Sequence, residues 1–248
     1  QLDVSGSLKK QPFIAKGTLD ATFDPKRISP LPSRMNATNF ILDWAGNRLT
    51  ANGGTTTSGK GVPIGNFNIQ IDAKNLSQIH SDFNGRIFGT VDLTGNTHTP
   101  DAQVNLAIEK FRSPTMSIKN ATLIGRIPQL ALQPSQLVLT VNEFRSGKQI
   151  INNINAKIIG TQQAHVLDFS AKTPKAQLDL QVAGGLNAQH DWNGEVRQGL
   201  LLSKKMTLRQ EKSAALQYLN QAKKVTLSAH CWSGAGRLCL TEPLVASA

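Results

Sequence analysis

The chain has 248 residues, a formal net charge of +11 and only 17% charged residues. Its polar share is largely Asn, Gln, Ser and Thr, which excludes a long coiled coil, and no apolar run reaches the ~18 residues of a transmembrane helix. Single all-β domains of about 200–250 residues are common, so the length allows one domain. Because Gln1 is not an initiator Met and no signal peptide is visible, we expect a fragment or mature segment whose anchor or targeting signal lies outside it.

Apolar and polar residues alternate along much of the chain, which is the pattern of a half-buried β-strand. The alternating segments are Gly17–Phe23, Phe40–Trp44, Phe67–Ala73, Ile87–Leu93, Val104–Ile108, Leu137–Val141, Ile154–Ile158, His165–Ala171, Ala176–Val182 and Val225–Ala229. Turn-forming sequences separate them: Ala45-Gly46-Asn47, Asn52-Gly53-Gly54, Asn84-Gly85, Gly95-Asn96, Ser146-Gly147, Gly184-Gly185 and Asn193-Gly194.

Each of these strands supplies one apolar face, and a sheet of such strands must curl or close to hide that face. We therefore predict an all-β fold: an elongated curled sheet of many short strands, taco-like or β-solenoid-like, with an apolar concave face and little helix. No linker divides the chain, so residues 1–248 are predicted to form a single elongated β-groove segment, with a basic segment and a Cys-paired turn at 197–240.

Three segments depart from the alternation. Asn75–Phe83 and Ser213–Lys224 space their apolar residues three and four apart and are predicted to be helical or irregular. Ser213 is a possible helix N-cap. Pro25–Pro32 contains three prolines and cannot be a central strand.

The sequence contains no recognisable catalytic or metal-binding constellation. Gly54–Gly61 approaches a phosphate-binding loop but has Gly61 where Mg²⁺ binding needs Ser or Thr, so a polar loop is predicted. No two of the five histidines (His80, His98, His165, His190 and His230) lie three or four residues apart, and we predict no metal. His165 alternates with Leu167 and is expected on the apolar side as a satisfied polar residue. The carboxylates are scattered singly, so we predict no enzyme activity and no cofactor.

Cys231 and Cys239 are the only cysteines, and the glycines between them suit a hairpin turn. A disulfide in an oxidising compartment is predicted. Two buried reduced thiols in a cytosolic protein are the alternative.

Basic residues concentrate between Arg197 and Lys224, where only Glu211 opposes them: Arg197, Lys204, Lys205, Arg209, Lys212, Lys223 and Lys224. We predict that they lie on the outer surface and attract anionic headgroups or an acidic partner. Lysines facing solvent with no partner are the alternative. Nucleic-acid binding is not predicted, because the segment has Tyr218 as its only aromatic residue.

The pair His230-Cys231-Trp232 and Leu238-Cys239-Leu240 resembles a signature of the TamB family of translocation and assembly module subunits. Upstream, Leu178-Asp-Leu-Gln-Val-Ala-Gly-Gly185 and Asp191-Trp-Asn-Gly-Glu-Val196 are similar to that family's strand pattern. The alternating strands alone would also fit AsmA-like proteins in general. The chain resembles an internal piece of the family's β-rich body.

The resemblance implies a periplasmic protein of Gram-negative bacteria, anchored in the inner membrane by a helix outside this chain. It also implies an outer-membrane barrel partner, TamA, contacted through regions outside this chain. The implied body is a curled sheet with an apolar groove, and the implied roles are phospholipid transport to the outer membrane and assistance to outer-membrane protein assembly.

Acyl chains suit an apolar groove, because burying them contributes about 0.8 kcal/mol per CH₂. The candidate groove residues are the apolar members of the strands: Phe67, Ile69, Ile71, Ile87, Val91, Leu93, Val104, Leu106, Ile108, Leu137, Leu139, Val141, Ile154, Ile158, Leu167, Phe169, Leu178, Leu180 and Val182.

Three functions remain open at this point: a phospholipid conduit, a chaperone-like scaffold for unfolded outer-membrane protein clients, and a secreted β-solenoid enzyme or adhesin. Copurified phospholipid would favour the first, and copurified peptide the second. Clustered carboxylates and exposed aromatics, typical of carbohydrate-active solenoids, are not evident in the sequence.

Overall fold

The computed structural model describes residues 1–22, 34–57, 63–96, 100–128 and 133–247. They form two compact units, Gln1–Leu130 and Ala131–Ala248. Strands make up nearly all the regular structure of both units, so the prediction of an all-β fold is confirmed. The proline segment Pro25–Pro32, residues 58–62 of the polar loop, and His98 lie outside the described residues.

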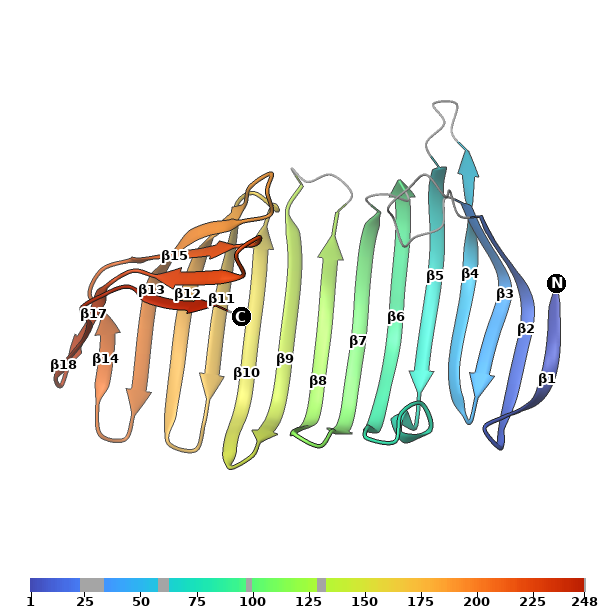
Figure 1. The fold of residues 1–248 in the computed structure, drawn as a ribbon, viewed down its shortest axis with the longest axis horizontal. Helices are drawn as coiled ribbons and strands as arrows, with labels where there is room; N and C mark the ends of the chain where they lie inside the picture. The colour runs from blue at the N-terminus through green and yellow to red at the C-terminus, as the bar shows by residue number, and fades with distance from the viewer. Residues whose placement is uncertain (23–33, 58–62, 97–99, 129–132, 248) are drawn as a thin grey trace. The chain divides into compact units, whose positions relative to one another are not determined.

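The first unit is an antiparallel meander in which each strand pairs with the next one along the chain (Figure 1). Its strands are β1 (Leu2–Leu8), β2 (Gln11–Thr22), β3 (Arg34–Trp44), β4 (Asn47–Thr57), β5 (Pro63–Ala73), β6 (Asn84–Asn96), β7 (Asp101–Arg112) and β8 (Met116–Ile127). A short 3₁₀ helix, η1 (Leu76–Gln78), follows β5, and the side chain of Asn75 caps it by accepting a hydrogen bond from the Ser77 amide.

The second unit starts as the same kind of meander and then divides. Its strands are β9 (Ser135–Ser146), β10 (Gln149–Gly160), β11 (His165–Lys172), β12 (Ala176–Leu186), β13 (Trp192–Ser203), β14 (Thr207–Gln210), β15 (Ala214–Leu219), β16 (Lys224–Leu227), β17 (His230–Gly234), β18 (Arg237–Leu240) and β19 (Leu244–Ser247).

Strand β13 is the point of division. Its first half, Trp192–Val196, pairs with β15, and its second half, Leu200–Leu202, pairs with β14. Strand β15 continues through β16 to β19, whereas β14 continues through β17 to β18. The two branches, β15–β16–β19 and β14–β17–β18, therefore start from the two halves of β13.

The strands are longer than the alternating segments that predicted them. Phe40–Trp44, for example, is the end of the 11-residue strand β3. The pairing register shifts between Ala37 and Phe40, between Lys16 and Thr18, and between Gln181 and Val182. Such bulges interrupt the alternation of side chains without ending the strand, so the sequence pattern breaks before the strand does.

Five predicted turns are wrong, because their glycines lie inside strands: Asn52-Gly53-Gly54 in β4, Asn84-Gly85 and Gly95-Asn96 in β6, Gly184-Gly185 in β12 and Asn193-Gly194 in β13. A Cβ atom on Gly53 would lie 1.9 Å from the backbone oxygen of Asn66 on β5, so the neighbouring strand excludes any side chain. In contrast, Ala45-Gly46-Asn47 joins β3 to β4, with Ala45 and Gly46 at positive φ.

The prediction of helix for Ser213–Lys224 is also wrong, since Ala214–Leu219 is strand β15. Ala214, Leu216 and Tyr218 alternate and pair with Val196, Gly194 and Trp192 of β13. Ala214 is completely buried in this pairing. Contacts made by tertiary structure therefore outweigh the local helix propensity of this segment.

The buried residues indicate that the first unit is a single layer. In the first unit most of them are alanines, with Phe67 and Leu76 as the large exceptions. No large side chain in the described part of the chain is fully buried. A sandwich or closed barrel would cover its large apolar side chains from both sides, whereas these sheets leave them half-exposed.

Candidate functional site

In the first unit, the strand register places every groove candidate on one face of the sheet. The register links Leu106 through Gly89 and Ile71 to Leu49 and Leu42 on one side, and to Leu123 on the other. We call this set the Leu106 row. It crosses six strands and contains no polar residue.

Parallel rows extend the same apolar face along the strands. One contains Ala51, Ile69, Val91, Val104 and Gly125. A second contains Ala37, Gly53, Phe67, Leu93, Ala102 and Ile127, and a third contains Trp44, Asn47, Ala73, Ile87, Ile108 and Ala121. The apolar face of the first unit is defined by these four rows.

Asn47 is the single polar member of those rows, and it is buried and fully engaged. Its amide nitrogen donates to the backbone oxygen of Asn75 at 3.0 Å, and its side-chain oxygen accepts from the Asn75 amide at 2.8 Å. Both bonds tie β4 to the segment before η1, where Leu76 is also buried. This end of the apolar face is therefore closed by a hydrogen-bonded loop.

The opposite face of the first unit carries paired charges. Arg86 Nε donates to Asp72 at 2.8 Å, and this hydrogen bond raises the pKa of the Arg86 guanidinium. Arg48 bonds Asp43 at 3.1 Å. The Arg86 guanidinium also lies 4.3 Å from the centre of the Phe88 ring, which covers an aromatic residue on the polar side. The two faces of the sheet therefore differ sharply in chemistry.

In the second unit, the register also collects every groove candidate on one face. One row runs through Leu137, Ile158, Leu167, Val182, Val196 and Ala214. The next contains Leu139, Ala156, Phe169, Leu180 and Gly199, and the third contains Val141, Ile154, Ala171, Leu178, Leu201 and Leu208. Leu139 is 36% exposed.

Two tryptophans lie on this apolar face, each over glycine. A Cβ atom on Gly199 would lie 2.1 Å from a ring carbon of Trp232, so that indole rests directly on the β13 backbone. Trp192 lies in the same way over Gly184 and Gly194. Gly184 and Gly194, which resemble turn residues in the sequence, therefore lie beneath the Trp192 ring.

His165 satisfies its polar atoms at the edge of this face, as its alternation with Leu167 predicts. Its Nε2 accepts a hydrogen bond from Trp192 Nε1 at 2.9 Å, and its Nδ1 lies 3.1 Å from the backbone oxygen of Thr161. With Nδ1–H donating to Thr161, the ring is neutral and fixes the orientation of Trp192.

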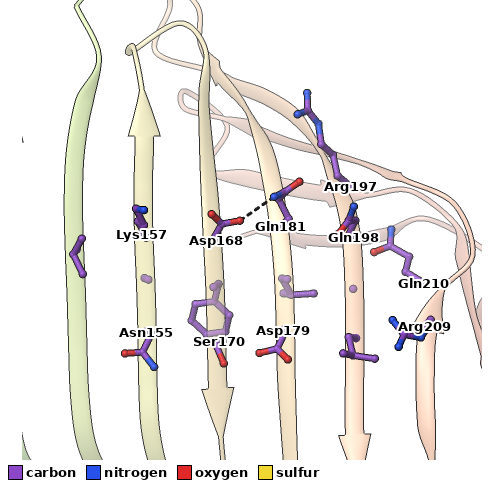
Figure 2. Close-up of a pocket in the computed structure, with 16 residues that line it drawn as sticks. Asn155, Lys157, Asp168, Ser170, Asp179, Gln181, Arg197, Gln198, Arg209 and Gln210 are labelled. Carbon is purple, nitrogen blue, oxygen red and sulfur yellow. Dashed lines mark hydrogen bonds between the residues drawn. The ribbon is translucent and has the colours of Figure 1, made fainter.

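A hollow of about 570 Å³ lies on the polar side of the second unit, where side chains from β10 to β14 converge (Figure 2). Its carboxylates are occupied by amides: Gln181 donates to Asp168 at 3.0 Å, and Gln177 donates to Asp179 at 2.9 Å. Arg197 is bonded to Glu195 at 3.1 Å. Arg209 lies at the margin of the hollow with no carboxylate partner among the described residues.

The structure places the predicted basic residues at the polar surface of the second unit. Arg197, Lys204, Lys205, Arg209, Lys212 and Lys223 are exposed, and Lys224 is half-buried. They come from β13, the turn after it, β14, and the loop before β16. The basic segment is therefore spread over several elements, and part of it gathers at the β13–β14 turn.

Cys231 and Cys239 face each other across the β17–β18 hairpin and are joined by a disulfide. The neighbouring residue Trp232 points to the other side of β17, onto Gly199. The hairpin that carries the cross-link therefore also carries the ring that covers the apolar face.

Sequence reasoning missed both tryptophan contacts and the hollow on the polar side of the second unit. Glycine inside an alternating strand was the available signal, since it marks a bulge or a close approach by another group. The partner in that approach comes from a distant strand and has no local pattern. Among the residues that the structure describes, no group of three or more His, Cys, Asp or Glu side chains could hold a metal ion, and no helix is long and apolar enough to cross a membrane.

Comparison with known proteins identifies the family of this chain. Residues 1–248 match the family model described as TamB, N-terminal domain. The translocation and assembly module subunit TamB of Haemophilus influenzae (strain ATCC 51907 / DSM 11121 / KW20 / Rd) is 22% identical over 243 residues, which cover 97% of this chain and 18% of that protein. No solved structure matches. The family is not one of enzymes. Because the family model covers the whole chain, this chain belongs to the TamB family.

Proposed function

We propose that this chain is a periplasmic segment of a protein that bridges the inner and outer membranes, and that its apolar faces carry phospholipid acyl chains. The observation that carries the proposal is the set of uninterrupted apolar rows, above all the Leu106 row. The Haemophilus influenzae relative is a translocation and assembly module subunit, which supports a role in envelope assembly.

The energetics support a lipid occupant. Soluble proteins rarely leave contiguous apolar patches larger than a few hundred Å² exposed to water. Here the large aliphatic side chains of both units stay half-exposed, so the apolar face has apolar area left to bury. An acyl chain lying along it contributes about 0.8 kcal/mol for each CH₂ removed from water.

The sidedness of the sheet supports the same occupant. On the polar face of the first unit, Arg48, Arg86 and Arg126 are each paired with a carboxylate. Paired, solvated charges keep that face in water, so acyl chains have one face available to them. We propose that the apolar face of each unit carries acyl chains, and that an outer-membrane barrel of the TamA type is contacted by other parts of the full-length protein.

Site-specific photocrosslinking tests the occupant. A photoreactive amino acid at Leu106 points along the apolar face, whereas one at Asn105 points to the opposite face of the same strand. We expect phospholipid adducts at position 106 and none at position 105, detected by mass spectrometry of the full-length protein from cells. Peptide adducts at position 106 would favour the chaperone-like scaffold instead, and equal labelling at both positions would contradict the proposal.

A charge placed on the Leu106 row tests transport. Leu106→Asp should fold, because an open face lets the carboxylate reach water, but it should interrupt passage of acyl chains. Asn105→Asp adds the same charge to the polar face and should leave outer-membrane integrity unchanged. A folded Leu106→Asp protein with normal integrity would count against the conduit, and an unfolded one would indicate a closed apolar core.

A further inference from the structure

A second, smaller hollow of about 480 Å³ lies at the β13–β14 turn. Lys204, Lys205 and Arg209 line it together with Thr207 and Ser233, and no carboxylate is among its lining residues. Arg209 and Ser233 are register partners on β14 and β17, so their side chains leave the sheet on the same side. With Ser203, three cations and three hydroxyl side chains therefore border one concave surface.

The charge of this hollow stands out against the rest of the chain. Six arginines elsewhere in the described residues are matched to carboxylates: Arg48 to Asp43, Arg86 to Asp72, Arg126 to Asp101, Arg145 to Glu143, Arg197 to Glu195 and Arg237 to Glu211. Lys204, Lys205 and Arg209 form no ion pair within the described ranges.

The acid closest to Arg209 in the sequence is already engaged elsewhere. Arg237 Nε donates to Glu211 Oε1 at 3.0 Å, and Arg237 Nη2 donates to Oε2 at 3.1 Å. This two-point pair occupies both carboxylate oxygens of Glu211. The positive charge of the hollow is therefore left without an internal counter-ion.

The chemistry of the hollow selects a particular class of ligand. A guanidinium binds phosphate through two parallel N–H groups, and ammonium groups add point charges. Thr207 and Ser233 offer hydroxyl donors for the remaining oxygens. Met206, 44% exposed at the same hollow, offers an apolar contact to the carbon skeleton beside a phosphate.

We propose that the hollow at the β13–β14 turn binds a phosphate ester group, with Arg209 as the principal contact and Lys204 and Lys205 beside it. A phospholipid headgroup is one source of such a group, and that version rests on the proposed function. A soluble phosphate ester is the other source. The site itself stands on charge and shape, independently of what the apolar faces carry.

Binding to two probes separates the sources. Glycerol 3-phosphate tests the soluble ester by calorimetry, and phosphatidylglycerol vesicles, with phosphatidylcholine vesicles as reference, test the headgroup by cosedimentation. We expect Arg209→Gln to weaken binding about tenfold, the loss of one charge-assisted contact. Arg209→Lys should retain part of the affinity, because lysine keeps the positive charge but lacks the two parallel N–H donors of the guanidinium.

Arg112→Gln is the matched control, because Arg112 is an exposed arginine of the first unit that also forms no ion pair among the described residues. It lowers the net charge by the same amount and should leave binding unchanged. Equal weakening by both variants would show that only net charge matters and would overturn the site. Absence of binding to either probe would overturn it as well. Phosphate binding with no lipid adduct at Leu106 would keep the site and reject the conduit.

Discussion

The two units use glycine on their apolar faces in different ways. In the first unit, Gly53 and Gly89 are approached by backbone oxygens of the neighbouring strand, and a Cβ atom there would lie 1.9 and 2.0 Å from them. In the second unit, Gly184 and Gly194 meet both a backbone oxygen of the neighbouring strand and the Trp192 ring, and Gly199 meets the Trp232 ring alone. A glycine in a strand therefore allows close backbone approach in both units, and in the second unit it also allows aromatic packing.

This difference separates an open face from a covered one. The first unit keeps its aliphatic rows available from β3 to β8, whereas the second unit covers two positions near β13 with Trp192 and Trp232. An acyl chain lying along the apolar face of the second unit would meet these rings at β13. Four experiments, ordered by expected effect, test this comparison: three in the covered region of the second unit and one in the open first unit.

The largest effect is expected at Trp232. Removing a packed aromatic ring costs roughly 3 kcal/mol, so Trp232→Ala should loosen β13, β14 and β17 in hydrogen exchange while β3–β6 stay protected. Gly199→Ala should give similar exchange, because the added methyl group displaces the ring. The double variant should be little worse than either single one. Fully additive effects would contradict the contact.

Loss of the disulfide should follow in size. For so short a loop the chain-entropy model gives about 2.5 kcal/mol, so Cys239→Ser should lower the urea midpoint of the second unit and leave the first unchanged. Alkylation of the unreduced protein, followed by intact mass measurement, checks the cross-link itself. Two alkylated cysteines in protein from an oxidising compartment would contradict it.

Trp192→Phe should have a smaller effect, because it keeps a ring over the glycines and removes the indole N–H. His165 Nε2 then loses the donor that lies 2.9 Å away. An unsatisfied half-buried acceptor costs about 1 kcal/mol, which should appear as faster exchange of β11 and the start of β13. Unchanged exchange there would show that the bond contributes nothing.

The smallest effect belongs to the open unit and depends on pH. Arg126 Nε donates to both Asp101 carboxylate oxygens at 3.0 Å, and this bonding holds the Asp101 pKa below its usual value. A depressed carboxyl pKa stabilises the fold above the unfolded-state pKa, and that stability is lost as the pH falls through the folded-state pKa.

Asp101→Asn should therefore cost less than about 1 kcal/mol at pH 7, since Arg126 is mostly exposed. The difference from the unsubstituted chain should close as the pH falls below about 4, and it should shrink in high salt. Urea titrations across this pH range measure it. A difference that is constant with pH would assign the loss to packing rather than to charge.

The alternation of apolar and polar residues predicted the apolar face well, because the face to which a side chain points is set by its position within its own strand. Residues such as Ile69, Leu106 and Leu180 fall on the face that period two assigns to them. The ends of strands were less predictable, since a bulge shifts the alternation and leaves the ladder intact. Ser213–Lys224 failed as a helix because its pairing with β13 is decided by residues some 20 positions earlier.

The pairing of each strand with its successor, described for β1–β8 and β9–β13, also bears on how the chain folds. Contacts between neighbours in sequence close short loops, and low contact order favours fast folding. Such a sheet can grow strand by strand from its first residues, without waiting for the end of the chain. The fork at β13 is different, because β14 must wait for β17, and β16 for β19. We therefore expect the branched region, β14–β19, to form last in the second unit. This is also the region that contains the disulfide.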